Sequence, residues 1–143
     1  MKIIFKLIII GLLVSSCNSS QSVTNTNQEP EIPEEDIVKL ESDALEYDII
    51  IIEPGFNSWL ATTARPEGYY SQSYMESKNW VLVQEWNARV LQPIKYNSDL
   101  YQSQIDYRPG INYGYDLNYK LYNYFIYFQL THNQRLSSMV PRI

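Results

Sequence analysis

The only cysteine of this 143-residue chain, Cys17, directly follows a short apolar leader. Lys2 and Lys6 give the leader a positive start, and its apolar stretch ends at Val14. That stretch is much shorter than the roughly 20 residues that a membrane-spanning helix needs. A short apolar core with charge before it and small residues after it is typical of a signal that is removed on export. The part of the chain that folds therefore has no cysteine for a disulfide, a thiolate nucleophile or a metal site, and its stability must come from packing.

The residues around Cys17 carry a second signal. Val14-Ser15-Ser16-Cys17 matches, position by position, the pattern of Leu or Val, two small residues and cysteine at which bacterial lipoprotein signals are cleaved. The resemblance implies that residues 1–16 are a lipoprotein signal peptide, that Cys17 is the lipid attachment site, and that two or three acyl chains are added. Two or three chains anchor a protein stably, whereas one binds a membrane only marginally. The alternative is an ordinary buried or free cysteine beside a signal.

Composition divides the rest of the chain into a tether and one domain. Residues 18–28 are almost entirely Ser, Thr, Asn and Gln, and an acidic, proline-containing stretch follows them. Such a segment cannot bury enough apolar surface to fold. We expect a flexible polar and acidic tether over residues 17–36, a globular domain over residues 37–135 and a loose tail over residues 136–143.

Charge, glycine content and histidine content exclude several partners. Without Lys2 and Lys6 the chain has nine Lys and Arg against 16 Asp and Glu, a formal charge of −7. Nucleic-acid binders instead carry basic patches. The five glycines are not in a phosphate-binding order, which argues against a nucleotide. A single histidine, His132, and the lack of an HExxH-type motif argue against a metal site. We therefore expect neither a cofactor nor a metal.

Four consecutive β-branched residues predict a strand. Residues 45–53 include Ile49-Ile50-Ile51-Ile52, and Pro54-Gly55 follows them. A continuous apolar run of this length fits a strand that is buried on both faces. The residues before it, from Ile37 to Ala44, allow a short helix.

A capping box predicts the first long helix. Ser73 and Glu76 have the spacing of such a box, and the helical pattern continues to about Leu91. Glu85 and Arg89 should form an i, i+4 ion pair on the face opposite the core. The buried face is predicted to hold Trp80, Val83, Trp86, Asn87, Val90 and Leu91.

Three more segments favour helix. Residues 56–60 indicate one or two helical turns, and Asn97-Ser98-Asp99 could cap a short helix that reaches Ile105. Residues 116–131 combine helical spacing with a strand-like content of Tyr, Phe and Ile. They contain no Gly or Pro for a turn, and one strand of this length would be unusual, so we favour a helix. The predicted fold class is α+β, with a small sheet of two or three strands packed against two longer helices in a single domain.

Candidate catalytic residues are few, and we assign none. No serine lies in a G-x-S-x-G elbow. His132 follows a predicted helix C-terminus, where an imidazolium stabilises the helix dipole; this structural role is favoured over catalysis. Glu53, at a strand end, is the best single candidate for the carboxylate pair of a glycoside hydrolase, although such residues are usually solvated or capping. The other carboxylates considered are Asp48, Glu85, Asp106 and Asp116.

The thirteen tyrosines suggest a binding surface. Many are interspersed with Asn, Gln and Ser, and aromatic faces beside amide groups suit sugars as well as protein partners. The third interpretation is that tyrosine fills space at the core boundary. A binding patch is expected first in the loop-rich stretch that follows the isoleucines, with Arg108 beside Pro109-Gly110 as a second candidate. The residues proposed for that first patch are Trp59, Arg65, Tyr69 and Tyr70.

Several features together carry a family resemblance. They are the signal at Cys17, the segment Tyr47-Asp48-Ile49-Ile50-Ile51-Ile52-Glu53-Pro54-Gly55-Phe56, and the pairs Trp80-Val81 and Tyr113-Gly114. With them the chain resembles small lipoproteins of the Bacteroidota that carry a domain of unknown function, over about residues 45–135. The resemblance implies no activity, so no catalytic residue carries over.

The residues after the cysteine bear on location. In that phylum, export to the cell surface is associated with acidic residues just after the lipidated cysteine, and Asn18-Ser19-Ser20-Gln21 lacks them. The resemblance therefore implies a protein that faces the periplasm. Because no aspartate follows Cys17, the outer membrane is favoured over the inner one.

The function predicted from the sequence is that of a membrane-anchored cell-envelope lipoprotein. Its domain is expected to be a non-catalytic protein-binding or structural module, whose partners are the membrane, through the lipid, and another envelope protein. A module that binds cell-wall glycan or peptidoglycan is the first alternative. A small carboxylate-dependent hydrolase that uses Glu53 or Asp48 is the second.

Overall fold

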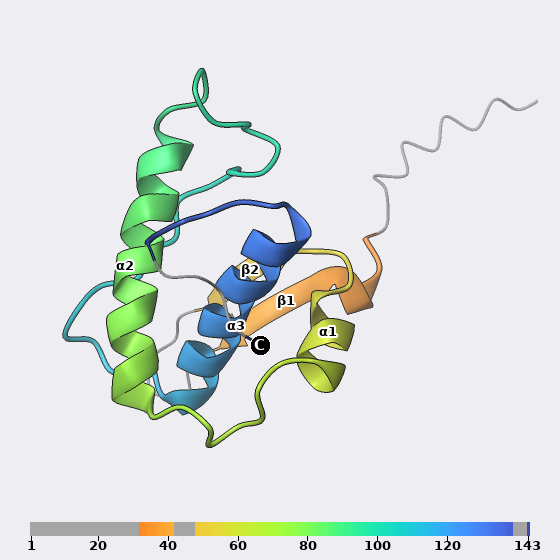
Figure 1. The fold of residues 1–143 in the computed structure, drawn as a ribbon, viewed down its shortest axis with the longest axis vertical. Helices are drawn as coiled ribbons and strands as arrows, with labels where there is room; N and C mark the ends of the chain where they lie inside the picture. The colour runs from red at the N-terminus through yellow and green to blue at the C-terminus, as the bar shows by residue number, and fades with distance from the viewer. Residues whose placement is uncertain (1–31, 42–47, 139–142) are drawn as a thin grey trace, which may run out of the picture. The chain divides into compact units, whose positions relative to one another are not determined.

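A central helix, α3 (Tyr115–Thr131), organises the domain (Figure 1). The computed structural model describes residues 32–41, 48–138 and 143. From residue 117 to residue 129 every α3 side chain except Lys120 is buried, and a helix that is buried all round forms the core of its domain. The described elements in chain order are the short 3-10 helix η1 (Glu34–Asp36), β1 (Ile37–Glu41), β2 (Asp48–Ile52), α1 (Phe56–Thr62), α2 (Gln72–Val90) and α3.

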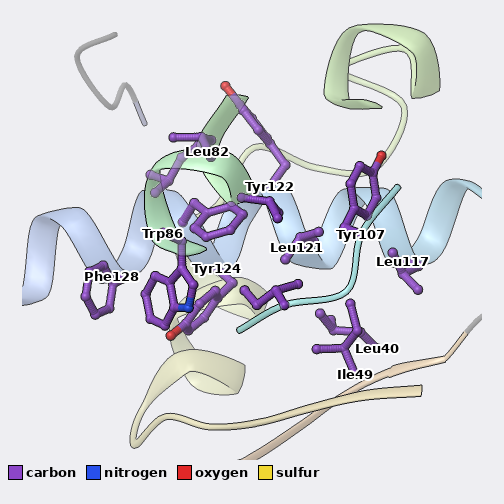
Figure 2. Packing of buried hydrophobic residues seen from close by; sticks show 14 of the residues in the cluster. Leu40, Ile49, Leu82, Trp86, Tyr107, Leu117, Leu121, Tyr122, Tyr124 and Phe128 are labelled. Carbon is purple, nitrogen blue, oxygen red and sulfur yellow. The ribbon is translucent and has the colours of Figure 1, made fainter. Parts of the chain in front are cut away.

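The predicted α+β fold class is confirmed. A two-stranded antiparallel sheet and three helices, two of them longer, form one compact domain, and α1, α2 and β1 all contact α3. Aromatic rings fill the junction of α2 and α3, where the Trp86 ring centre lies 4.8 Å from that of Phe128 and 5.9 Å from that of Tyr124 (Figure 2). The helix predicted over residues 116–131 begins one residue earlier, at Tyr115.

The strands form a hairpin in which Lys39 lies opposite Ile50. The short helix expected from Ile37 is wrong over the described residues, because residues 37–41 pair with β2 as a strand; residues 42–47 lie outside the described residues. The prediction that the isoleucine strand is buried on both faces is also wrong. Ile49 packs into the core, but Ile50 is 63% and Ile52 49% exposed, because the helices cover only one face of this small sheet.

The boundaries of α2 differ slightly from the prediction. Its N-cap is Ser71, whose Oγ accepts a hydrogen bond from the Tyr74 amide at 3.3 Å, so the capping box at Ser73 is wrong. A serine hydroxyl at an N-cap satisfies one of the free amides of the first turn. The helix ends at Val90, one residue before the expected end.

The buried face of α2 is rotated relative to the prediction. Two of the residues expected in the core, Trp80 and Leu91, are exposed. The buried set is Met75, Asn79, Leu82, Val83, Trp86 and Arg89. Asn79 belongs to this face: it is buried against α3, and its Nδ2 donates to Asn118 Oδ1 at 3.1 Å.

Residues 91–114 connect α2 to α3 without a helix or strand. The short helix expected after Asn97 is wrong: the Asn97 side chain instead accepts a hydrogen bond from the Asp99 amide at 2.9 Å, which closes a turn. The C-terminal segment expected as a loose tail starts at Leu136, which is buried and donates its amide to Gln129 Oε1. None of the helices in the described part of the chain is long and apolar enough to cross a membrane.

Candidate functional site

A groove of about 450 Å³ lies along β2. One wall is formed by residues 49–54 and the other by residues of the segment 99–106. Three core aromatic residues, Trp86, Tyr124 and Phe128, whose packing Figure 2 shows, also line the groove. We call this cavity the β2 groove. It brings together titratable side chains from distant parts of the chain, as is expected of a binding or active site.

The wall formed by β2 presents an unpaired strand edge. The Glu53 amide donates to Asp36 O at 2.8 Å, which fixes the alternation of the antiparallel ladder. In that alternation the amide and carbonyl groups of Ile50 and Ile52 point away from β1. Among the described residues, no hydrogen bond reaches these outward groups. The edge can therefore accept the backbone of another strand.

The opposite wall is held in place by side chains of α2. Trp86 Nε1 donates to Ser103 O at 2.9 Å. The Asn87 amide forms a pair of bonds with Ile105, accepting from its N and donating to its O, both at 2.8 Å. Because these bonds satisfy the backbone of an irregular segment, that wall is fixed without regular secondary structure.

A glutamate and the single histidine meet at one end of the groove. The His132 Nε2 lies 2.9 Å from Glu53 Oε1, across 79 residues of sequence. His132 follows the last turn of α3, as predicted, and its ring lies 4.9 Å from that of Phe128. Sequence reasoning considered both residues but did not pair them. The sequence indicates only that Glu53 lies at the end of a predicted strand and that His132 follows the end of a predicted helix.

Glu53 can orient the His132 ring as a proton acceptor, but no nucleophile is hydrogen-bonded to that ring in the described part of the chain. A carboxylate that binds one imidazole nitrogen holds the ring in one tautomer, as in a catalytic triad. Among the described residues, no hydroxyl or amine is hydrogen-bonded to the His132 ring. The hydroxyl of the nearby Tyr124 stays protonated at neutral pH, because burial raises its pKa and the Glu53 carboxylate raises that pKa further.

The structure brings together three of the four residues of the predicted loop patch. The Arg65 guanidinium lies 5.0 Å from the Tyr69 ring centre, and the rings of Tyr69 and Tyr70 meet edge to face at 4.7 Å. Trp59 instead packs against Tyr127, 5.4 Å between ring centres. Arg65 also donates to the carbonyl of Ile143 at 2.8 Å.

Several other tyrosines attach loops to the core. Hydroxyl groups on α3 donate to backbone oxygens far away in sequence: Tyr119 to Arg65 at 2.7 Å, and Tyr127 to Pro54 at 2.6 Å. The Tyr115 hydroxyl accepts from the Gly68 amide at 2.6 Å. These tyrosines fill space at the boundary of the core, which was the third interpretation of the tyrosine content in the sequence analysis.

The remaining candidates are dispersed. Three of the carboxylates form separate ion pairs: Glu85 with Arg89, Asp106 with Arg108, and Asp116 with Lys120. Of these, Asp106 also lines the β2 groove. The side chain of Asp48 and all of Cys17 lie outside what the structure describes. In the described ranges, no three His, Cys, Asp or Glu side chains cluster as a metal site would need.

Comparisons with known proteins give a family without a function. The sequence profile of a family of unknown function (DUF6146) matches residues 4–141. No curated protein matches the chain. No solved structure matches it either.

Proposed function

The chain belongs to DUF6146, and because no function is known for that family, we propose a role from the residues themselves: a lipid-anchored protein of the bacterial cell envelope that binds an extended segment of another envelope protein. The binding domain is proposed to be non-catalytic. We further propose that the protein comes from the Bacteroidota and faces the periplasm from the outer membrane.

The anchor is supported by the sequence. Val14-Ser15-Ser16-Cys17 has the order of a lipoprotein cleavage site, and two or three acyl chains on Cys17 would hold the protein at a membrane. The polar residues 18–28 and the acidic stretch after them would act as a spacer between membrane and domain. The proposed partner would therefore meet the domain at some distance from the lipid surface.

The single observation that carries the binding role is the unpaired edge of β2. An extended segment can add to such an edge, with main-chain hydrogen bonds that supply affinity. Exposed strand edges are normally covered or blunted, because they invite pairing with other chains. Here the edge adjoins a groove, and the exposed side chains of Ile50 and Ile52 offer apolar contact to a partner.

The charges around the groove favour a basic partner segment. Glu53, Asp99 and Asp106 all line it. Asp106 is already paired with Arg108 and Glu53 with His132, whereas the carboxylate of Asp99 is exposed and has no ion pair among the described residues. Complementary charge mainly speeds and selects association. Binding should therefore weaken as the salt concentration rises.

A photo-reactive residue at position 50 tests this proposal in cells. The full-length protein with p-benzoylphenylalanine in place of Ile50 should crosslink to one reproducible envelope protein, and the same residue in place of the exposed Gln84 of α2 should not. If neither position, or both equally, gives a crosslinked partner, the β2 groove is not the binding site.

Two matched substitutions then separate backbone pairing from side-chain contact. Ile50→Pro removes an amide that the ladder with β1 does not use, so it should abolish crosslinking from position 52 while the domain stays folded. Ile50→Thr keeps the amide and should retain crosslinking. Equal crosslinking by both variants would exclude strand addition.

The Glu53–His132 pair keeps a hydrolase as the second candidate. Of the two carboxylates suggested from the sequence, Glu53 does line a cleft with a second titratable group. If the pair acts in catalysis, full-length protein should hydrolyse peptidoglycan fragments or model esters, and Glu53→Gln should lower the rate by at least about 100-fold. No turnover, or a rate unchanged in Glu53→Gln, would remove this candidate.

A further inference from the structure

We propose that a second groove, between α2 and the segment 107–112, binds an uncharged saccharide. It has a volume of about 540 Å³ and shares no lining residue with the β2 groove. Four residues of α2 form one side, and residues 107–112 form the other. The α2 residues are Gln72, Glu76, Ser77 and Trp80. We call this cavity the Trp80 groove.

Three polar side chains of the Trp80 groove are fixed by one another. Gln72 Nε2 donates to Glu76 Oε1 at 2.8 Å and to Asn112 Oδ1 at 2.7 Å. The Asn112 oxygen also accepts from the Gly114 amide at 3.0 Å. These bonds use both hydrogens of the Gln72 amide and hold two walls of the groove in one arrangement. The site is therefore organised before a ligand arrives, which lowers the cost of binding.

The same network leaves hydrogen-bonding capacity for a ligand. Among the described residues, no partner is found for Gln72 Oε1, for the second carboxylate oxygen of Glu76 or for Asn112 Nδ2. Two acceptors and a donor on neighbouring side chains match the hydroxyl groups of a sugar, each of which can donate and accept.

Trp80 supplies the apolar part of the groove. Its side chain is 36% exposed. In the described part of the chain its ring stacks on no other aromatic ring, whereas Trp59 and Trp86 are packed against tyrosine and phenylalanine. A large indole that is left open beside polar groups offers a flat face for the C–H surface of a pyranose, with the amides placed for its hydroxyls.

The charges of the groove favour an uncharged ligand over an anionic one. The Glu76 carboxylate would repel a phosphate or a nucleotide, and the cation on the other wall, Arg108, is occupied by Asp106, with 2.8 Å between its Nε and the carboxylate. An uncharged sugar is thus favoured over an anion. This site is independent of the proposed protein partner, because the two grooves do not overlap.

Titration with defined oligosaccharides tests the proposal. Full-length protein in a detergent without a sugar headgroup would be titrated with chitotetraose, cellotetraose and maltotetraose, by calorimetry and by tryptophan fluorescence. We expect saturable binding of at least one, with a fluorescence change that Trp80→Phe removes. A preference for chitotetraose would assign part of the affinity to its acetamido groups.

Variants of the groove give the decisive comparison. Trp80→Ala should weaken binding at least tenfold, and Gln72→Ala, which breaks the network, should weaken it several-fold. Val81→Ala alters the neighbouring exposed residue outside the groove and should bind as the unaltered protein does. No binding of any of the three sugars by folded protein, or equal binding by Trp80→Ala and Val81→Ala, would overturn the proposal.

Discussion

Arg89 should be the cation on which the stability of this domain depends most. It is buried near the end of α2, where Nε donates to Glu85 at 2.9 Å, Nη1 donates to the Tyr101 hydroxyl at 2.8 Å and Nη2 donates to Arg135 O. Its guanidinium also lies 4.8 Å from the Tyr96 ring centre. Burial by itself lowers the pKa of Arg89, but the hydrogen bonds to Glu85 and Tyr101 outweigh it and the pKa is raised, so the group stays charged.

The expected cost of Arg89→Met follows from these contacts. Methionine keeps an unbranched apolar stem but removes all three hydrogen bonds. The buried hydrogen bond to the Tyr101 hydroxyl contributes about 1.5–3 kcal/mol, and the part-buried bond to Arg135 O contributes about 1 kcal/mol. The bond to the half-exposed Glu85 adds less than about 1 kcal/mol, and the contact with the tyrosine rings adds about 0.5–1 kcal/mol. We therefore expect a loss of about 3–6 kcal/mol in the free energy of unfolding, and about half of that for Arg89→Lys, which keeps the charge but cannot make all three bonds.

Urea unfolding, followed by circular dichroism and tryptophan fluorescence, measures this loss. Lys95→Met is the matched control, because Lys95 also lies over the Tyr96 ring, at 4.9 Å, but is exposed; it should cost less than about 1 kcal/mol. A loss below about 1 kcal/mol for Arg89→Met, or one equal to that of Lys95→Met, would refute this account of Arg89.

Two further perturbations test how tyrosines hold the domain together. Gly55 has φ +78°, and a Cβ there would lie 3.0 Å from Tyr127 Oη, so Gly55→Ala should cost at least about 1–2 kcal/mol, and less when Tyr127→Phe is also present; additive costs in urea unfolding would contradict this contact. Burial raises the pKa of Tyr107, Tyr122 and Tyr124, whereas unfolded tyrosines ionise near pH 10. The unfolded chain then releases protons that the folded one keeps, so the contribution of these tyrosines to the unfolding free energy should be constant below about pH 9 and lost as the pH rises above 10; a profile that stays flat from pH 9 to pH 11 would contradict it.

The sequence predicted the elements whose signals are local. Helical spacing after the isoleucines indicated α1, and the helix α3 followed from its length and its lack of Gly or Pro, although its composition favours a strand. Its composition favours a strand because α3 is buried on all sides, so positions that would be polar on a surface helix carry Tyr, Phe or Ile. The strand predicted over residues 45–53 from its β-branched residues contains β2, which spans Asp48–Ile52; residues 45–47 lie outside the described residues.

The errors arose where non-local contacts decide the structure. Ile37 and Leu40 have helical spacing, but residues 37–41 pair with β2, and a pattern within one segment cannot reveal its partner. The loop from residue 91 to residue 114 is fixed by side chains of α2, such as Trp86 and Asn87, rather than by its own hydrogen bonds.

The candidate sites also depend on non-local contacts that the sequence does not show. Glu53 and His132 were each considered from the sequence, but their contact joins the end of β2 to the end of α3 across the fold. Trp80 was assigned to the core because its spacing fits the buried face of α2. In the structure the neighbouring Asn79 takes the buried position and binds Asn118, while Trp80 is exposed, and the spacing of apolar residues cannot indicate that a polar residue is the buried one.

The intact mass of the protein, purified from its native membranes, tests the proposed anchor most directly. The proposal predicts a chain that begins at Cys17 and carries the added mass of two or three acyl chains, all of it on that residue after proteolysis. A free thiol at Cys17, or a chain that still includes residues 1–16, would contradict the anchor and with it the proposed place of this domain in the envelope.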